Sequence, residues 1–198
     1  MILKKSKKLF KVLGVTTALT ATILPTMALN STTAQADEIV VEPPQSGFHL
    51  SDFGMPSKSK LDWGSVQLDR NINGGVLSLN NVKYFKGLGA HSNGEIQYDL
   101  NGQYDRFISV IGVDDTVGYQ QGSVIFQVFA DGIKVYDSGI MKAGDSSKKV
   151  DISIQGAFGL KLVVLDGDGN INNDHANWAD AQLYPTLGSP LLPPECIG

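Results

Sequence analysis

The richest set of polar side chains in this chain lies between Asp166 and Asp180, directly after the apolar run Leu160–Leu165. These fifteen residues combine carboxylates, side-chain amides, His175 and Trp178. A strand that ends in glycines, carboxylates and amides is entering a loop. Oxygen-rich side chains suit a hydroxylated ligand or a hard cation, and a tryptophan presents an apolar plate. The loop is therefore the first candidate for a binding site.

Part of this loop has the spacing of a calcium-binding loop. Asp166, Asp168, Asn170 and Asn172 stand at positions 1, 3, 5 and 7 of an EF-hand, but position 6 is isoleucine and position 12 is asparagine. A standard EF-hand is thus excluded. Calcium at Asp166 and Asp168 and a solvated turn both remain open. An alternative calcium site pairs Asp52, near the first expected strand, with Asp180, near the last.

A second group of residues surrounds His91 in the run Gly87-Leu-Gly-Ala-His91. Glycines on both sides of a leucine allow close approach of another backbone. His91 either contacts a ligand or forms a hydrogen bond inside the core. Trp63, before Gly64 and an alternating strand, is expected in the core, whereas Trp178 is equally compatible with binding and with packing.

Catalytic motifs are absent from the sequence. There is no G-x-S-x-G and no H-E-x-x-H. The one cysteine, Cys196, is the third residue from the C-terminal end, where it is expected as an exposed tail thiol, with pairing to another chain as the alternative. Two loop carboxylates could flank a glycosidic bond, but aspartates are also common in turns. The sequence favours binding without chemistry, and a glycosidase stays open as an alternative.

The elements that must position these residues are strands. Apolar and polar residues alternate over 95–100 and 150–155, which predicts strands with one wet face. Runs 107–113 and 124–130 are denser in β-branched and aromatic residues and predict central strands. Asp131-Gly132 between two apolar runs predicts a hairpin. Many short strands and no sustained 3.6-residue period indicate an all-β sandwich.

The ends of the chain have different compositions from the middle. Residues 1–36 have a lysine-rich start, an apolar stretch and the sequence Ala34-Gln-Ala36, which predicts a secretory signal peptide of Gram-positive bacterial type. Residues 37–47 are expected to be a linker and 185–198 a proline-rich tail. One domain, 48–184, lies between them. We expect a secreted protein that is not inserted in the membrane after cleavage.

Charge excludes one class of partner. Removal of five signal-peptide lysines from 16 basic residues leaves 11 against 20 acidic residues, a net charge of −9. Nucleic-acid binding requires a basic surface, so no nucleic-acid partner is expected.

Six sequence segments in this order resemble the NPCBM family of carbohydrate-binding modules. They are Leu50–Asp52, Trp63–Val66, Tyr84–His91, Ile111–Asp115, Gly122–Gly132 and Asp174–Asp180. The resemblance covers about Phe48–Leu183. It implies a galactose-binding-like jelly-roll β-sandwich, usually joined to secreted bacterial glycoside hydrolases, which recognises terminal galactose-type sugars and commonly holds a structural calcium. A glycoside hydrolase is the partner it implies.

Carried over position by position, the resemblance implies seven glycan-binding residues. They are Tyr84, His91, Asp114, Asp115, Asp174, His175 and Trp178. We expect His91, Asp115, Asp174 and His175 to form hydrogen bonds with sugar hydroxyls, and Trp178 or Tyr84 to offer a ring face. The expected function is weak glycan binding without catalysis. A protein-binding adhesion module on the same fold is the main alternative.

Overall fold

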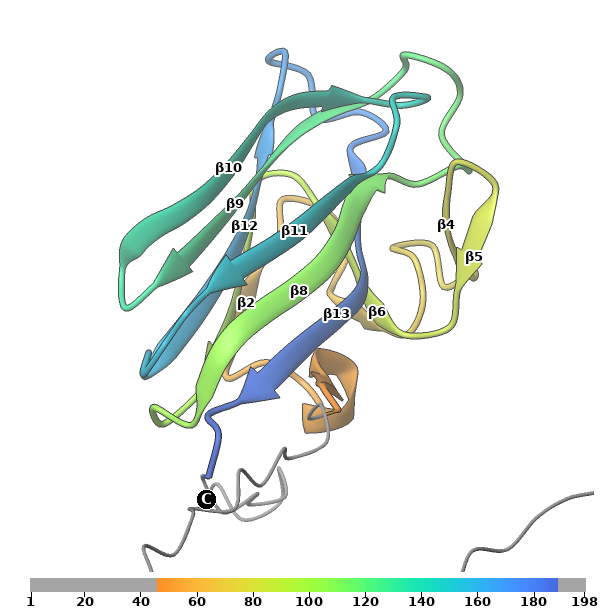
Figure 1. Ribbon diagram of the computed structural model, residues 1–198. Helices are drawn as coiled ribbons and strands as arrows, with labels where there is room; N and C mark the ends of the chain where they lie inside the picture. Colours follow the sequence, from red (N-terminus) through yellow and green to blue (C-terminus); the bar gives the residue numbers. More distant parts are fainter. Residues whose placement is uncertain (1–45, 189–198) are drawn as a thin grey trace, which may run out of the picture. The chain divides into compact units, whose positions relative to one another are not determined.

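The computed structural model describes residues 46–188, which fold into two facing antiparallel sheets (Figure 1). The first sheet contains β1 (Phe48–His49), β3 (Gln67–Leu68), β6 (Gly87–His91), β8 (Tyr104–Val113), β11 (Lys148–Ser153) and β13 (His175–Pro185). The second contains β2 (Lys58–Lys60), β7 (Gly94–Asp99), β9 (Ser123–Ala130), β10 (Ile133–Lys142) and β12 (Gly159–Asp166). A separate ribbon pairs β4 (Leu77–Leu79) with β5 (Val82–Tyr84).

In both sheets, neighbouring strands come from distant parts of the chain. The first sheet runs β11-β8-β13-β6-β3, with β1 also paired to β13, and the second runs β10-β9-β12-β7-β2. Within residues 46–188 the only helical element is a 3-10 turn, η1 (Leu50–Phe53). The expected all-β sandwich is confirmed. The predicted signal peptide and most of both predicted end segments lie outside the described residues.

The strands form where apolar residues alternate. In β7, Ile96 and Tyr98 are buried while Glu95 and Asp99 are exposed. The predicted hairpin is also confirmed, because Asp131 and Gly132 connect β9 to β10 with φ of 49° and 80°. Positive φ at both central residues is the geometry that this dipeptide favours.

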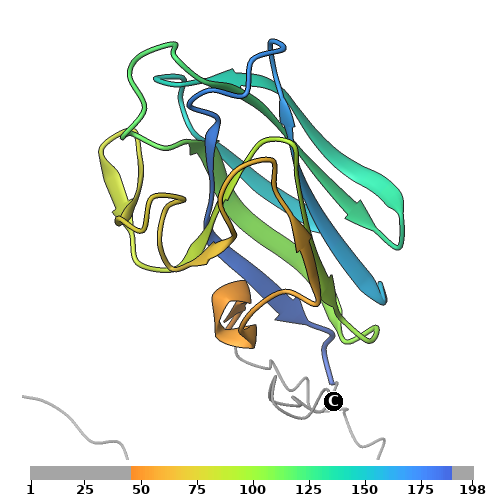
Figure 2. The same cartoon turned by 180° about the vertical axis from the view of Figure 1, so that it is seen from behind.

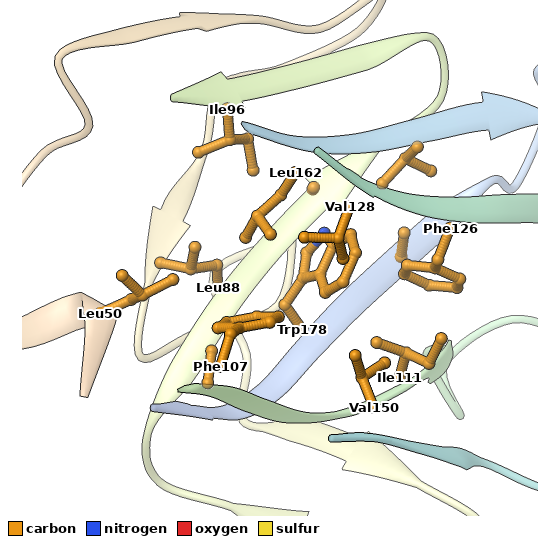
Figure 3. Packing of buried hydrophobic residues seen from close by; sticks show 14 of the residues in the cluster. Leu50, Leu88, Ile96, Phe107, Ile111, Phe126, Val128, Val150, Leu162 and Trp178 are labelled. Carbon is orange, nitrogen blue, oxygen red and sulfur yellow. The ribbon is translucent and has the colours of Figure 1, made fainter. Parts of the chain in front are cut away.

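The core lies between the two sheets and is centred on Trp178 (Figure 3). The Trp178 ring meets Phe126 of the opposite sheet edge to face, with centroids 5.0 Å apart. Phe107 lies on its other side at 6.2 Å. Burial of a tryptophan and two phenylalanines between sheets contributes several kcal/mol of hydrophobic stabilisation. Trp178 is therefore a core residue, and its prediction as a sugar contact is wrong.

β13 positions the candidate site. It is paired with β6 and β8, and its first residue, His175, lies directly opposite His91, the last residue of β6. The loop between β2 and β3, the β6–β7 turn and the loop before β13 meet near this end of the sandwich (Figure 2). The C-terminal end of β13 lies at the other end.

Candidate functional site

Three aromatic rings form the floor and wall of a small cavity. His91 and His175 have ring centroids 5.7 Å apart, and Trp63 stacks on His175 at 5.9 Å with only 10° between the planes. Trp63 also lies 5.4 Å from His91. With residues 171–173 these rings line a cavity of about 150 Å³ that is open to solvent. A cavity of this size can hold one sugar ring.

Trp63 is the residue whose role sequence reasoning missed. It was expected in the core, but half of its surface is exposed. It belongs to a bend between β2 and β3, where no strand periodicity exists to indicate its direction. The signal that could have found it is its flanking sequence, because Asp62 and Gly64 on either side favour a surface bend over a buried strand.

The two histidines use their Nδ1 atoms differently. His91 is almost fully buried, and its Nδ1 lies 3.0 Å from the carbonyl oxygen of Ser92. The Nδ1 of His175 lies 3.4 Å from Nδ2 of Asn73. Burial, and then the neighbouring His91, lower the pKa of His175, so that this ring is neutral at pH 7.

Asn73 reaches His175 because its loop lies against β6 at a glycine. A Cβ atom at Gly89 would collide with the backbone of Arg70 and Asn71. Asn71 then holds the loop, since its side-chain Oδ1 accepts from the backbone N–H groups of Asn73 and Gly75. The second glycine of the Gly-Leu-Gly run therefore serves to bring this loop to the site.

Asp114 is a positioning residue and not a surface contact. Its carboxylate is buried and accepts five hydrogen bonds, from the side chains of Asn71, Thr116 and Asn177 and from the backbone of Ser78 and Thr116. Its own N–H donates to the carbonyl of His175. The predicted contact between Asp114 and sugar is therefore wrong, although Asp114 connects the loop of Asn73 to β13.

Asp115 has a similar structural role at the β4–β5 ribbon. Its carboxylate accepts from the hydroxyl of Ser78 at 2.5 Å and from the backbone N–H groups of Asn80 and Asn81, each at 2.8 Å. These bonds fix the turn of the ribbon. Asp115 does not line the cavity.

Asp174 and Tyr84 also lie outside the cavity lining. The Asp174 carboxylate has no solvent contact; one oxygen accepts from the N–H of Ser123, and the other has no partner with hydrogen-bond geometry among the described residues, although Ser92 Oγ is near. Burial raises the pKa of Asp174. Tyr84 is half-buried on β5. Of the seven predicted residues, the structure brings His91 and His175 into the cavity.

Three of the predicted calcium ligands, Asp166, Asp168 and Asp52, are held by groups of the protein itself. Asp166 accepts from the backbone N–H groups of Asp168 and Gly169, and Asp168 accepts from that of Asn170, so both form turns. In the alternative pair, Asp52 is bound by the Lys86 ammonium at 2.6 Å. Over residues 46–188 no three His, Cys, Asp or Glu side chains converge as a metal site. Asp52, Asp166 and Asp168 thus already have partners within the protein, which disfavours calcium at these positions.

Comparison with known proteins gives the family. The NPCBM/NEW2 domain profile matches residues 47–184. The chain is 32% identical to a protein of Renibacterium salmoninarum named "Putative endo-alpha-N-acetylgalactosaminidase", over 85% of this chain and 12% of that protein. It spans 12% and 19% of the lengths of the curated relatives it matches.

Solved structures agree with this result. A CBM51 module from Clostridium perfringens GH95, in complex with methyl-galactose, is 36% identical with a TM-score of 0.66 and covers 70% of this chain and 99% of that one. A CBM51-2 module with INT domains from Clostridium perfringens ZmpB, in complex with GlcNAc, is 32% identical with a TM-score of 0.67, covering 72% and 32%. In the described part of this chain, no helix is long and apolar enough to span a membrane. This chain belongs to the NPCBM/NEW2 domain family, with the fold of the CBM51 carbohydrate-binding modules.

Proposed function

We propose that this domain binds one terminal sugar ring of a glycan in the cavity formed by Trp63, His91 and His175. The observation that carries the proposal is the half-exposed Trp63 ring beside two histidine rings. A sugar has an apolar C–H face and polar edges, so an aromatic plate with hydrogen-bonding neighbours matches both. The amides of Asn172 and Asn173 border the same cavity and add donors and acceptors.

The sugar class that we propose is galactose or an N-acetylhexosamine. Relatives with the same fold were solved with methyl-galactose and with GlcNAc. Because the cavity holds about 150 Å³, few ligand atoms lose water on binding. We therefore expect dissociation constants from tens of micromolar to millimolar, on the order of −4 to −6 kcal/mol.

Binding without hydrolysis is part of the proposal. Glycoside hydrolysis generally uses two carboxylates on either side of the scissile bond. The described side chains that line the cavity include no carboxylate, and the adjacent Asp174 is fully buried. We propose that the domain brings glycan to a secreted glycoside hydrolase, as a module within a larger protein or as a separate partner.

Replacement of Trp63 tests the site. We expect Trp63→Ala to weaken methyl-galactoside or N-acetylglucosamine binding at least about tenfold, or ~1.4 kcal/mol, because the ring face is lost. Isothermal titration calorimetry measures this change. The matched control is Phe158→Ala, since Phe158 is another exposed aromatic, near the β7–β8 turn and away from the site. Equal affinity of wild type and Trp63→Ala would contradict the proposal, and a protein-binding role would then account better for the exposed ring.

A further inference from the structure

The His175 ring contacts Asn73, a residue outside the cavity lining. We propose that Asn73 holds His175 in the tautomer that carries its proton on Nε2, so that the cavity offers a sugar one donor and one acceptor. The ligand in this proposal rests on the proposed function, whereas the proton position is a property of the free domain.

The contact between Asn73 and His175 sets the direction of the hydrogen bond. Nδ2 of Asn73 lies 3.4 Å from Nδ1 of His175. With the amide nitrogen of Asn73 facing the ring, the amide donates and Nδ1 accepts, whereas the opposite amide orientation would present Oδ1 as an acceptor of Nδ1–H. In a neutral imidazole the proton then sits on Nε2. Asn73 therefore makes His175 a donor through Nε2.

His91 has the opposite polarity. Its Nδ1 lies 3.0 Å from the carbonyl oxygen of Ser92, which accepts only, so Nδ1 carries the proton and Nε2 keeps a lone pair. Among residues 46–188 no group forms a hydrogen bond with Nε2 of either ring. A sugar with two neighbouring hydroxyls satisfies both histidines, since one hydroxyl donates to His91 and the other accepts from His175. A sugar blocked by methyl or sulfate at these hydroxyls cannot donate.

Three titratable groups surround His175, and none of them forms a hydrogen bond with its ring. They are His91 on β6, Asp114 after β8 and Asp174, the preceding residue. Asp114 favours protonation of His175, but burial and His91 act against it. Arg70, in the same loop as Asn73, directs its guanidinium to the carbonyl of Gly74 at 3.0 Å. In the described part of the chain, Asn73 is the one hydrogen-bond partner of the His175 side chain.

Asn73 can be replaced without disturbing its loop. The side chain of Asn73 makes no other hydrogen bond within residues 46–188. The loop depends instead on Asn71, which accepts from the N–H of Gly74 through its carbonyl and from the N–H of Gly75 through Oδ1, both at 2.8 Å. A substitution at position 73 therefore changes the partner of His175 and leaves the turn intact.

Asn73→Asp exchanges the donor for an acceptor. The carboxylate accepts from Nδ1–H of His175 and raises the pKa of that ring. Near pH 7 the ring is then protonated and Nε2 still donates. At about pH 9, above the histidine range, the neutral ring keeps its proton on Nδ1 and Nε2 no longer donates. We expect wild type to bind methyl-galactoside equally at both pH values, and Asn73→Asp to bind about tenfold more weakly at the higher pH.

The control is Asn101→Asp, which makes the same charge change at an exposed turn beyond the far end of β7. Nitrogen chemical shifts of the imidazole read the tautomer directly in the sugar-free domain. We expect Nε2–H for His175 in wild type, and Nδ1–H in Asn73→Asp at about pH 9. Nδ1–H in wild type, or Asn73→Asp binding that does not change with pH, would overturn the inference. Wild type that binds no sugar but keeps Nε2–H would instead overturn the proposed function and leave the proton assignment standing.

Discussion

Asp114 and Asp174 are two buried carboxylates with very different surroundings. Asp114 accepts five hydrogen bonds, which replace the water lost on burial. Asp174 accepts one, from Ser123 N–H, and no cationic side chain among the described residues forms an ion pair with it. An ionised carboxylate in such a place is costly. Ionised Asp174 therefore lowers the stability of the folded domain at neutral pH.

Asp174→Asn is expected to stabilise the domain at pH 7. Because the pKa of Asp174 is raised above 3.8 in the folded state, the folded carboxyl holds its proton more tightly than the unfolded one. The stability this provides is complete below pH 3.8 and is lost as pH rises through the folded pKa. An asparagine carries no charge, so the gain in Tm over wild type should be largest at neutral pH and disappear in acid. Thermal unfolding across this range measures it; a destabilised variant at pH 7 would show that the ionised form has a partner.

The β4–β5 ribbon shows how an element is built around one side chain. Asp115 lies after β8, yet its carboxylate accepts two backbone N–H groups in the turn of the ribbon and the hydroxyl of Ser78. The backbone N–H of Asp115 also donates to the carbonyl of Ser78. These bonds connect the ribbon to the first sheet. The loop of Asn73 directly precedes β4 in the chain, so the bonds that fix the ribbon also fix the C-terminal end of this loop.

Asp115→Ala separates the structural role from a sugar-binding role. We expect a loss of about 1–2 kcal/mol in the free energy of unfolding, because three hydrogen bonds disappear at the surface. Affinity for methyl-galactoside should stay within about twofold of wild type. Asp99→Ala is the control, since Asp99 is exposed and its side chain makes no hydrogen bond within residues 46–188. Lost affinity with unchanged stability would return Asp115 to the binding site.

The strands could be predicted from the sequence. Whether a side chain faces the core or solvent could not be predicted in a bend or in a strand that is buried on both faces. Alternation indicates β7 and β11 because each has one face in water. β13 lacks this signal, since residues 176–179 are all buried, and Trp178 could therefore not be assigned to a face. Trp63 lies in a bend, where no alternation of apolar and polar residues indicates which way its side chain points. His91 and His175 were found as residues, but their pairing depends on the β6–β13 register, which joins positions 84 residues apart.

In the whole domain, the candidate site and the C-terminal end of β13 lie at opposite ends of the sandwich. The strand starts at His175 in the site and ends at Pro185 at the other end of the sandwich (Figure 1). A site opposite the point where the chain continues stays free to meet a glycan when the domain is joined to other domains. This arrangement is consistent with relatives in which the matched segment is a small share of the protein.

The ammonium group of Lys86 connects η1 to the segment that follows β3. Lys86 lies 2.6 Å from Asp52 and 3.0 Å from Asp69. Its backbone carbonyl accepts from the N–H of Asp180. The side chain thus neutralises Asp52, one of the two carboxylates of the alternative calcium site.

Because Lys86 already neutralises Asp52, we expect EDTA to leave the Tm of the domain unchanged. We expect Lys86→Ala to lower the free energy of unfolding by up to about 1 kcal/mol, since the ion pairs of Lys86 with Asp52 and Asp69 are partly exposed. Differential scanning calorimetry with calcium and with EDTA measures both. A Tm that falls in EDTA would contradict this expectation and show that the domain binds calcium.

The central claim is the location of the sugar site. Titration of methyl-galactoside and of N-acetylglucosamine into the ¹⁵N-labelled domain, followed by NMR, tests it most directly. We predict that shift changes concentrate at Trp63, His91 and residues 171–175, with that of the Trp63 indole N–H among the largest. Changes concentrated instead on the outer face of the second sheet, around Gln97 and Lys161, would contradict it, as would a folded domain that shows no change with either sugar.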